Sequence, residues 1–108
     1  MRPEDFDLGN GTVTFWDLDS LDAARSLADQ RDHLKEDLAQ IQFGDELILD
    51  IGWYPEFSAD GEFVVSLVRA DNWDAPVFEQ RVADVPNLGA AVARAVRTAE
   101  GRSDEHEG

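Results

Sequence analysis

Residues 46–82 contain three consecutive strand patterns, and the first, Glu46-Leu-Ile-Leu-Asp-Ile-Gly-Trp-Tyr54, is the clearest. Apolar residues occupy every second position of this segment, which is the period of a strand with one buried face. Residues 62–69 repeat the period after the turn signal Asp60-Gly61, and residues 77–82 follow a polar loop as a third strand. Connections this short require antiparallel pairing, because a parallel return needs about a dozen residues. The stretch predicts a three-stranded antiparallel meander.

The residues before the meander predict one more strand and a long helix. Thr12-Val-Thr-Phe-Trp16 alternates and is rich in β-branched and aromatic residues, which favour strands. From about Leu21 to Gln42, apolar residues recur at three- and four-residue spacing, which indicates an amphipathic helix. The residues from Asp17 to Ser20 offer capping side chains for its start, and Gly44 offers a left-handed stop.

After the meander, the sequence predicts a second, shorter helix that begins near Pro86, ends near Ala99 and is stopped by Gly101. The tail, residues 102–108, is charged and is expected to be disordered. The predicted order is therefore strand, helix, three strands, helix, in a single α+β domain over residues 1–101. We expect two layers: an antiparallel sheet of about four strands with both helices packed on one face. The first strand can join either edge of the meander.

The composition is strongly acidic, with 24 acidic residues against nine basic ones in a chain of 108 and a net charge of −15. Such a charge argues against nucleic-acid binding, which needs basic residues, and it attracts a basic protein. Adaptation to high salt explains the charge equally well. The chain has no cysteine, no apolar run long enough to cross a membrane and no secretory signal pattern, so we expect a cytoplasmic protein.

Few residues offer catalytic chemistry. The two histidines are His33, on the polar side of the expected helix, and His106 in the tail, and no serine has a histidine partner in a recognisable motif. Two acidic groups, Asp17/Asp19/Asp22 and Asp71/Asp74, do not follow a calcium-loop pattern and are better explained as caps and a turn. We therefore expect a protein without enzymatic activity, metal or cofactor.

Aromatic and acidic residues occur together at the ends and in the loops of the meander. Tryptophan and tyrosine are enriched where binding energy is concentrated, and neighbouring carboxylates select a basic partner. Trp53 is in phase with the buried positions, so we assign it to the core rather than to a binding surface. The candidate partner-binding residues are Tyr54, Glu56, Phe57, Asp60, Asp71, Trp73 and Asp74. Both a binding role and a purely structural role are open for them.

Three motifs resemble a known family. Asp50-Ile-Gly-Trp-Tyr-Pro-Glu56, then Asp60-Gly-Glu-Phe63, then Asn72-Trp-Asp-Ala-Pro76, followed by a short terminal helix, look like small bacterial immunity proteins. These are inhibitors encoded beside the toxins of contact-dependent growth inhibition and related polymorphic toxin systems. The likeness covers residues 47–96 and does not extend to the first part of the chain.

The resemblance implies a non-enzymatic immunity protein that binds and neutralises a cognate basic toxin domain, which in these systems is often a nuclease. Its implied partner agrees with the charge, because a basic substrate site complements an acidic inhibitor. The alternative from the residues themselves is a salt-adapted acidic structural or scaffolding domain without a toxin partner. Such a domain could form a homodimer through a free sheet edge.

Overall fold

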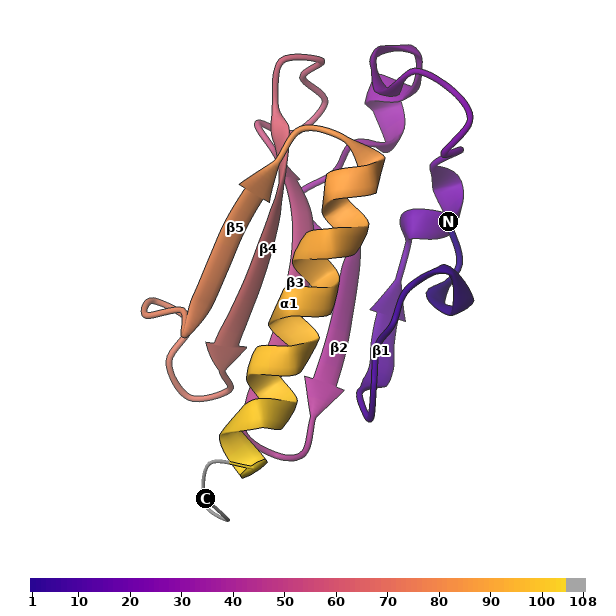
Figure 1. Ribbon diagram of the computed structural model, residues 1–108. Helices are drawn as coiled ribbons and strands as arrows, with labels where there is room; N and C mark the ends of the chain where they lie inside the picture. The colour runs from indigo at the N-terminus through magenta and orange to yellow at the C-terminus, as the bar shows by residue number, and fades with distance from the viewer. Residues whose placement is uncertain (105–108) are drawn as a thin grey trace.

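The alternating segments pair into one open antiparallel sheet of five strands in the computed structural model, which describes residues 1–104 (Figure 1). The strands lie in chain order across the sheet, so each is hydrogen-bonded to its neighbours in the sequence. They are β1 (Thr12–Trp16), β2 (Ala39–Phe43), β3 (Leu47–Tyr54), β4 (Glu62–Arg69) and β5 (Phe78–Val82). The α+β class, the first strand and the meander of β3, β4 and β5 are confirmed.

The long helix expected from Leu21 to Gln42 is wrong. A 3₁₀ segment, η2 (Leu18–Ser20), lies just before this region, and the region itself forms a second one, η3 (Leu27–His33), followed by strand β2. A third 3₁₀ turn, η1 (Pro3–Asp5), precedes β1. The buried Gln30 side chain closes the intervening loop, because it accepts from the amide of Asp22 and donates to that residue's carbonyl. Aspartate and serine compete with helical hydrogen bonds, which weakens the helix in this region.

Strand β2 replaces the last part of the expected helix because it gives β3 a second hydrogen-bonded neighbour. Ala39 pairs with Ile51 and Phe43 with Leu47 in an antiparallel ladder. Ala39 and Ile41 are fully buried, whereas the intervening glutamines lie on the other face. The sheet thus has five strands instead of about four, and β1 joins it through β2. Gly44 has the expected positive φ, 61°, but it lies in the β2–β3 turn and not at a helix end.

One face of the sheet is covered. The helix α1 (Val85–Asp104) packs over β3, β4 and β5 (Figure 1). The backbone amide of Asn87 donates a hydrogen bond to the Asp84 carboxylate, which caps the helix start. The N-terminal segment covers the neighbouring part of the core with Met1, Phe6 and Leu8. Between residues 1 and 104, α1 is the single α-helix, whereas two helices were expected. It also continues through Gly101, so the expected stop there is wrong; residues 105–108 of the expected tail lie outside the described residues.

The opposite side of the sheet, which we call the open face, has no helix among the described residues (Figure 1). The register assigns side chains to this face, because residues directly opposite each other in a ladder point to the same side. Val64 and Val68 are buried there but do not belong to the core cluster under α1. The principal open-face residues are Phe15, Gln40, Gln42, Ile48, Asp50, Gly52, Tyr54, Glu62, Val64, Ser66, Val68, Glu79 and Arg81.

Candidate functional site

A bulge next to β3 brings two carboxylates onto the open face. The β2–β3 pairing continues past Ala39 through bonds from the Leu38 amide to the Ile51 carbonyl and from the Trp53 amide to the Lys35 carbonyl. Between these bonds, the Glu36–Asp37 segment rises over Gly52. A Cβ at Gly52 would collide with the carbonyl oxygen of Glu36, so only glycine leaves room for the bulge.

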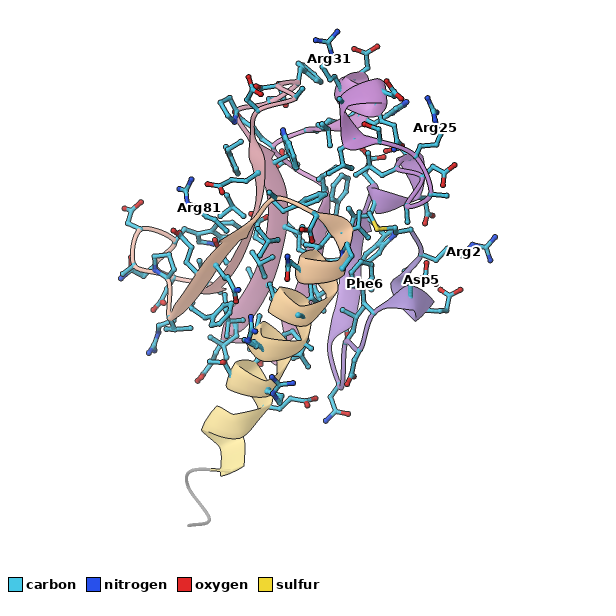
Figure 2. The ribbon with its side chains drawn as sticks, turned by 45° about the horizontal axis from the view of Figure 1, so that its top comes forward. Arg2, Asp5, Phe6, Arg25, Arg31 and Arg81 are labelled. Atoms are coloured by element: carbon cyan, nitrogen blue, oxygen red, sulfur yellow. The ribbon has the colours of Figure 1, made fainter. Side chains whose placement is uncertain are left out.

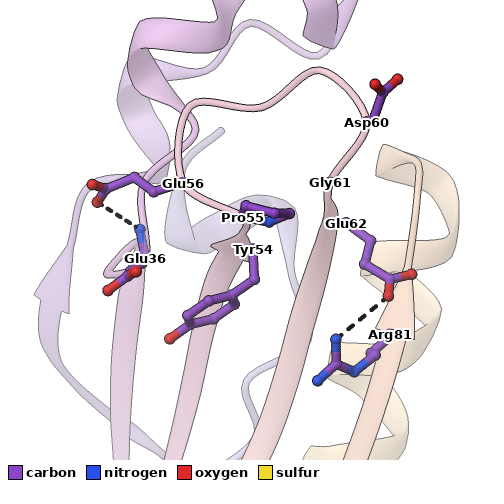
Figure 3. A pocket seen from close by; sticks show the side chains of 8 residues that line it. All are labelled: Glu36, Tyr54, Pro55, Glu56, Asp60, Gly61, Glu62 and Arg81. Atoms are coloured by element: carbon purple, nitrogen blue, oxygen red, sulfur yellow. Dashed lines mark hydrogen bonds and ion pairs between the residues drawn. The ribbon is translucent and has the colours of Figure 1, made fainter.

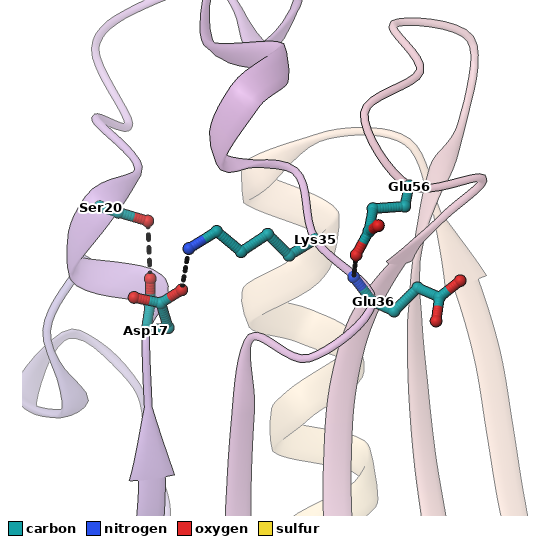
Figure 4. A network of polar contacts seen from close by, with 5 residues as sticks. All are labelled: Asp17, Ser20, Lys35, Glu36 and Glu56. Atoms are coloured by element: carbon teal, nitrogen blue, oxygen red, sulfur yellow. Dashed lines mark hydrogen bonds and ion pairs between the residues drawn. The ribbon is translucent and has the colours of Figure 1, made fainter.

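The β3–β4 loop, residues 55–61, is fastened to this bulge. The carboxylate of Glu56 accepts a hydrogen bond of 3.2 Å from the Glu36 amide (Figure 4). The amide of Phe57 donates to the Leu34 carbonyl at 2.7 Å, and the indole of Trp53 donates to the Ser58 carbonyl at 2.7 Å. These bonds tie the loop both to the segment before β2 and to the core. The loop is therefore held in place before any partner binds.

A shallow depression of about 600 Å³ lies where this loop meets the open face (Figure 3). Tyr54 extends across it, and Arg81 of β5 stands on the far wall, where it forms an ion pair of 3.6 Å with Glu62. Four of the eight lining residues are acidic, against one arginine. The lining residues are Glu36, Tyr54, Pro55, Glu56, Asp60, Gly61, Glu62 and Arg81.

Asp50 lies in the middle of β3 on the same face, beyond the depression. Burial is the main cause that raises the pKa of its carboxyl to about 6; a hydrogen bond from Gln40 opposes the rise and the negative charge of Asp37 adds to it. That bond is long, 3.4 Å from Nε2 to Oδ1. No ion pair forms on Asp50 within the described residues. The carboxylate is thus only weakly compensated in the isolated chain.

Tyr54 lies among negative charges. Partial burial raises the pKa of its hydroxyl above the ordinary value of 10.0, and four carboxylates raise it further. The tyrosine therefore keeps its proton at neutral pH and can act as a hydrogen-bond donor. In order of effect, the four carboxylates are Asp50, Glu36, Asp37 and Glu56.

Basic side chains are placed mostly elsewhere. Figure 2 shows Arg2, Arg25 and Arg31 pointing outward from the N-terminal part of the chain, away from β5, which carries Arg81. Lys35 is already paired with Asp17 at 2.8 Å (Figure 4). Arg81 is the one basic residue of the five strands in phase with the open face, and it contacts both Glu62 and Glu79. The open face near Tyr54 consequently has a surplus of negative charge.

The seven residues predicted to bind a partner fall into two groups at opposite ends of the sheet. Tyr54, Glu56 and Asp60 line the depression, and Phe57 lies in the same loop with half of its surface exposed. The residues of the β4–β5 loop lie at the other end of β4, roughly 23 Å away for an eight-residue strand. This second group is Asp71, Trp73 and Asp74. The structure does not bring the two groups together.

Phe57 has a positive φ of 65°, which is uncommon for a residue other than glycine. Trp73 is also exposed, to 46%, in the β4–β5 loop. Trp53, in contrast, is buried and contacts Phe63 edge-to-face with ring centroids 4.8 Å apart. Its assignment to the core is confirmed.

Four residues of this region were not among the predicted binding residues: Glu36, Asp37, Asp50 and Arg81. The first two were assigned to the helix that does not form. One signal was present, since Gly52 interrupts a strand, and an isolated glycine there often marks a close approach of another backbone segment. The assignment of Asp17 and Asp19 as helix caps is wrong. Asp17 pairs with Lys35, and Asp19 accepts from the Trp16 indole.

Within residues 1–104, no group of three or more histidine, cysteine, aspartate or glutamate side chains is arranged to hold a metal ion. The described part of the chain also has no helix that is long and apolar enough to cross a membrane. The chain matches no family model, and no curated protein or solved structure matches it significantly. The geometry and the charge of the open face therefore carry the functional argument.

Proposed function

We propose that this chain is a non-enzymatic immunity protein that binds and neutralises a cognate basic toxin domain, such as a nuclease. The observation that carries the proposal is the acid-lined depression beside Tyr54, on a chain whose net charge is −15. A field of this sign accelerates association with a basic protein, and exposed aromatic residues provide contact area once the partners meet.

The motifs that resemble immunity proteins support the same proposal through their positions. Within Asp50–Glu56, the alternate residues Asp50 and Tyr54 lie on the open face, whereas Ile51 and Trp53 are buried under the helix side. The second motif adds Asp60 to the depression and Phe63 to the core. These two motifs thus combine residues that fix the fold with residues that remain available to a partner.

The test is capture of a partner, followed by neutralisation. The protein is used as bait in its native lysate at low and at moderate salt, and a recovered basic protein is then produced in a growth assay with and without this chain. We expect one stoichiometric partner whose capture weakens with salt, and growth only when both proteins are present. A recovered protein that is not toxic, or whose toxicity this chain does not relieve, would contradict the proposal.

The second candidate is a salt-adapted structural domain that forms a homodimer. One observation favours it: β1 is an edge strand, and Thr12–Trp16 carries no charged residue that would discourage pairing with another strand. This candidate predicts unfolding at low ionic strength with recovery at high salt. It also predicts a dimer in sedimentation experiments. A monomer that remains folded at low salt would exclude it.

A further inference from the structure

The two groups of candidate binding residues lie at opposite ends of the sheet, so their surroundings can be compared. The Tyr54 group is continuous with the open face, which extends from the depression to Asp50, Gln40 and Phe15. Phe15 and Tyr54 are 43% and 37% exposed, so both offer aromatic surface. The residues of the β4–β5 loop do not line the depression, and its Asp71 is already near Arg69, at 3.7 Å.

The charges on the open face specify the partner's chemistry. Four carboxylates act on Tyr54, and none of them forms an ion pair within the described residues. A guanidinium group suits the space beside the Tyr54 ring and these carboxylates better than an ammonium group does. It can stack on an aromatic ring while it donates to two carboxylate oxygens. A second copy of this chain is unsuitable, because each copy carries a charge of −15.

The area of the open face indicates that further residues are needed for a stable interface. Two strands of eight residues and three of five, at about 3.3 Å per residue and a spacing of about 4.8 Å, give a flat area of roughly 490 Å². A stable interface covers about 800 Å² on each partner. The open face alone is therefore too small, and the adjoining β3–β4 loop, with Glu56 and Phe57, supplies additional contact area.

We infer that the open face and the β3–β4 loop form the docking surface for a basic protein, with an arginine side chain of that protein placed between the Tyr54 ring and the carboxylates of Asp50 and Glu36. The β4–β5 loop lies outside the interface. The inference rests on the proposed function for the existence of a basic partner, and it adds the surface and the residue type that this partner presents.

The first experiment uses a defined probe, a short peptide of alternating arginine and alanine, titrated into the ¹⁵N-labelled chain. A peptide with citrulline in place of arginine has the same shape without the charge. We expect amide shifts centred on Asp50, Tyr54 and Glu36 with the arginine peptide, and none with the citrulline peptide. Shifts spread evenly over the acidic surface, or centred on Asp71–Asp74, would overturn the inference.

Matched double variants sharpen the test. D50N/Y54A and D71N/W73A each remove one negative charge and one aromatic side chain, at opposite ends of the sheet. We expect the first pair to weaken peptide binding about tenfold or more and the second pair by less than about twofold. The amide spectrum of each variant shows whether its fold is retained. A single variant, Asp50→Asn, covers the case in which loss of Tyr54 disturbs the strand.

Failure of this inference can be distinguished from failure of the proposed function. If the peptide binds at Tyr54 but no toxin is neutralised, the docking surface stands and the immunity role is wrong. If a toxin is neutralised equally well by D50N/Y54A, but not by D71N/W73A, the immunity role stands and the docking surface is wrong. Amide shifts that depend on protein concentration in the absence of peptide would indicate self-association through this face and would also overturn the inference.

Discussion

The two faces of the sheet are made from the same strands, but they are built from different residues. Under α1, the side chains are apolar and fully buried, as in Leu49, Ile51 and Phe63. On the open face, the strands carry glutamine, aspartate, serine and glutamate among a few aliphatic residues. The covered face therefore supplies most of the hydrophobic stabilisation, since this scales with the apolar area removed from water.

The charged groups of the open face indicate a role in binding rather than in stability. A face needed only for stability would pair its charges or replace them with apolar groups, because a half-buried and weakly compensated carboxylate costs free energy. Asp50 is such a carboxylate, and the Glu36–Asp37 bulge places two exposed carboxylates beside it. Groups that weaken the isolated protein but suit a partner are typical of binding surfaces.

Two alanine substitutions in β3 compare the stability that each face supplies, because this strand has one isoleucine on either face. Ile51 is fully buried under the helix side, and Ile48 is partly exposed on the open face. We expect Ile51→Ala to lower the free energy of unfolding by about 4 kcal/mol and Ile48→Ala by about 1 kcal/mol. Urea denaturation measures both. Equal losses would show that the open face is covered in solution, contrary to the structure.

The next effect tests the bulge that brings Glu36 onto the open face. Gly52→Ala places a Cβ against the Glu36 carbonyl, which hydrogen bonds on either side hold in place. We expect a loss of about 2–3 kcal/mol from overpacking.

The matched control for this substitution is Gly89→Ala in α1, where the added Cβ meets no atom within 4 Å. Alanine is the better helix former, so we expect a gain of up to about 1 kcal/mol. Thermal or urea unfolding compares the two variants. If both variants lost similar amounts of stability, the contact between the new Cβ and the Glu36 carbonyl would not be the cause of the loss at Gly52.

Much of the fold could be predicted from the sequence, because a period of two is a local signal. It located β1, β3 and β4, and turn chemistry placed the loops between the later strands. The helix predicted from Leu21 to Gln42 was wrong for a physical reason. The leucine spacing of this region fits a helix, whereas the alternation Ala39-Gln-Ile-Gln-Phe43 at its end fits a strand. Pairing with the edge of β3 favours the strand over the helix. This pairing joins separate segments of the chain, so it cannot be predicted from the spacing of residues within one segment.

The candidate site was predicted in part for a related reason. Tyr54, Glu56 and Asp60 do line one depression. Their grouping with Trp73 overlooked a consequence of the meander itself, which places consecutive loops at opposite ends of the sheet, so this separation could have been predicted. The positions of Glu36 and Asp37 could not, since they depend on the unforeseen strand β2 and its bulge.

The smallest expected effect concerns Asp50 and depends on pH. Its pKa is about 6 in the folded chain, against an ordinary value of 3.8, so the folded form binds the proton more tightly than the unfolded form. The resulting stabilisation is fully present below about pH 4 and is lost as the pH rises through about 6.

Asp50→Asn copies the neutral carboxyl, and it retains an amide oxygen that can accept from Gln40. We expect this variant to be more stable than the natural chain by about 1 kcal/mol at pH 7, allowing for solvent screening of a partly exposed group, and equally stable below pH 4. Urea midpoints measured across this range test the expectation, with Asp71→Asn in the exposed loop as a control that shows no such trend. Parallel curves for Asp50→Asn and the natural chain would mean that Asp50 is well solvated. A gain in stability with a loss of arginine-peptide binding would show that the open face retains this carboxylate for a partner at the expense of the isolated fold.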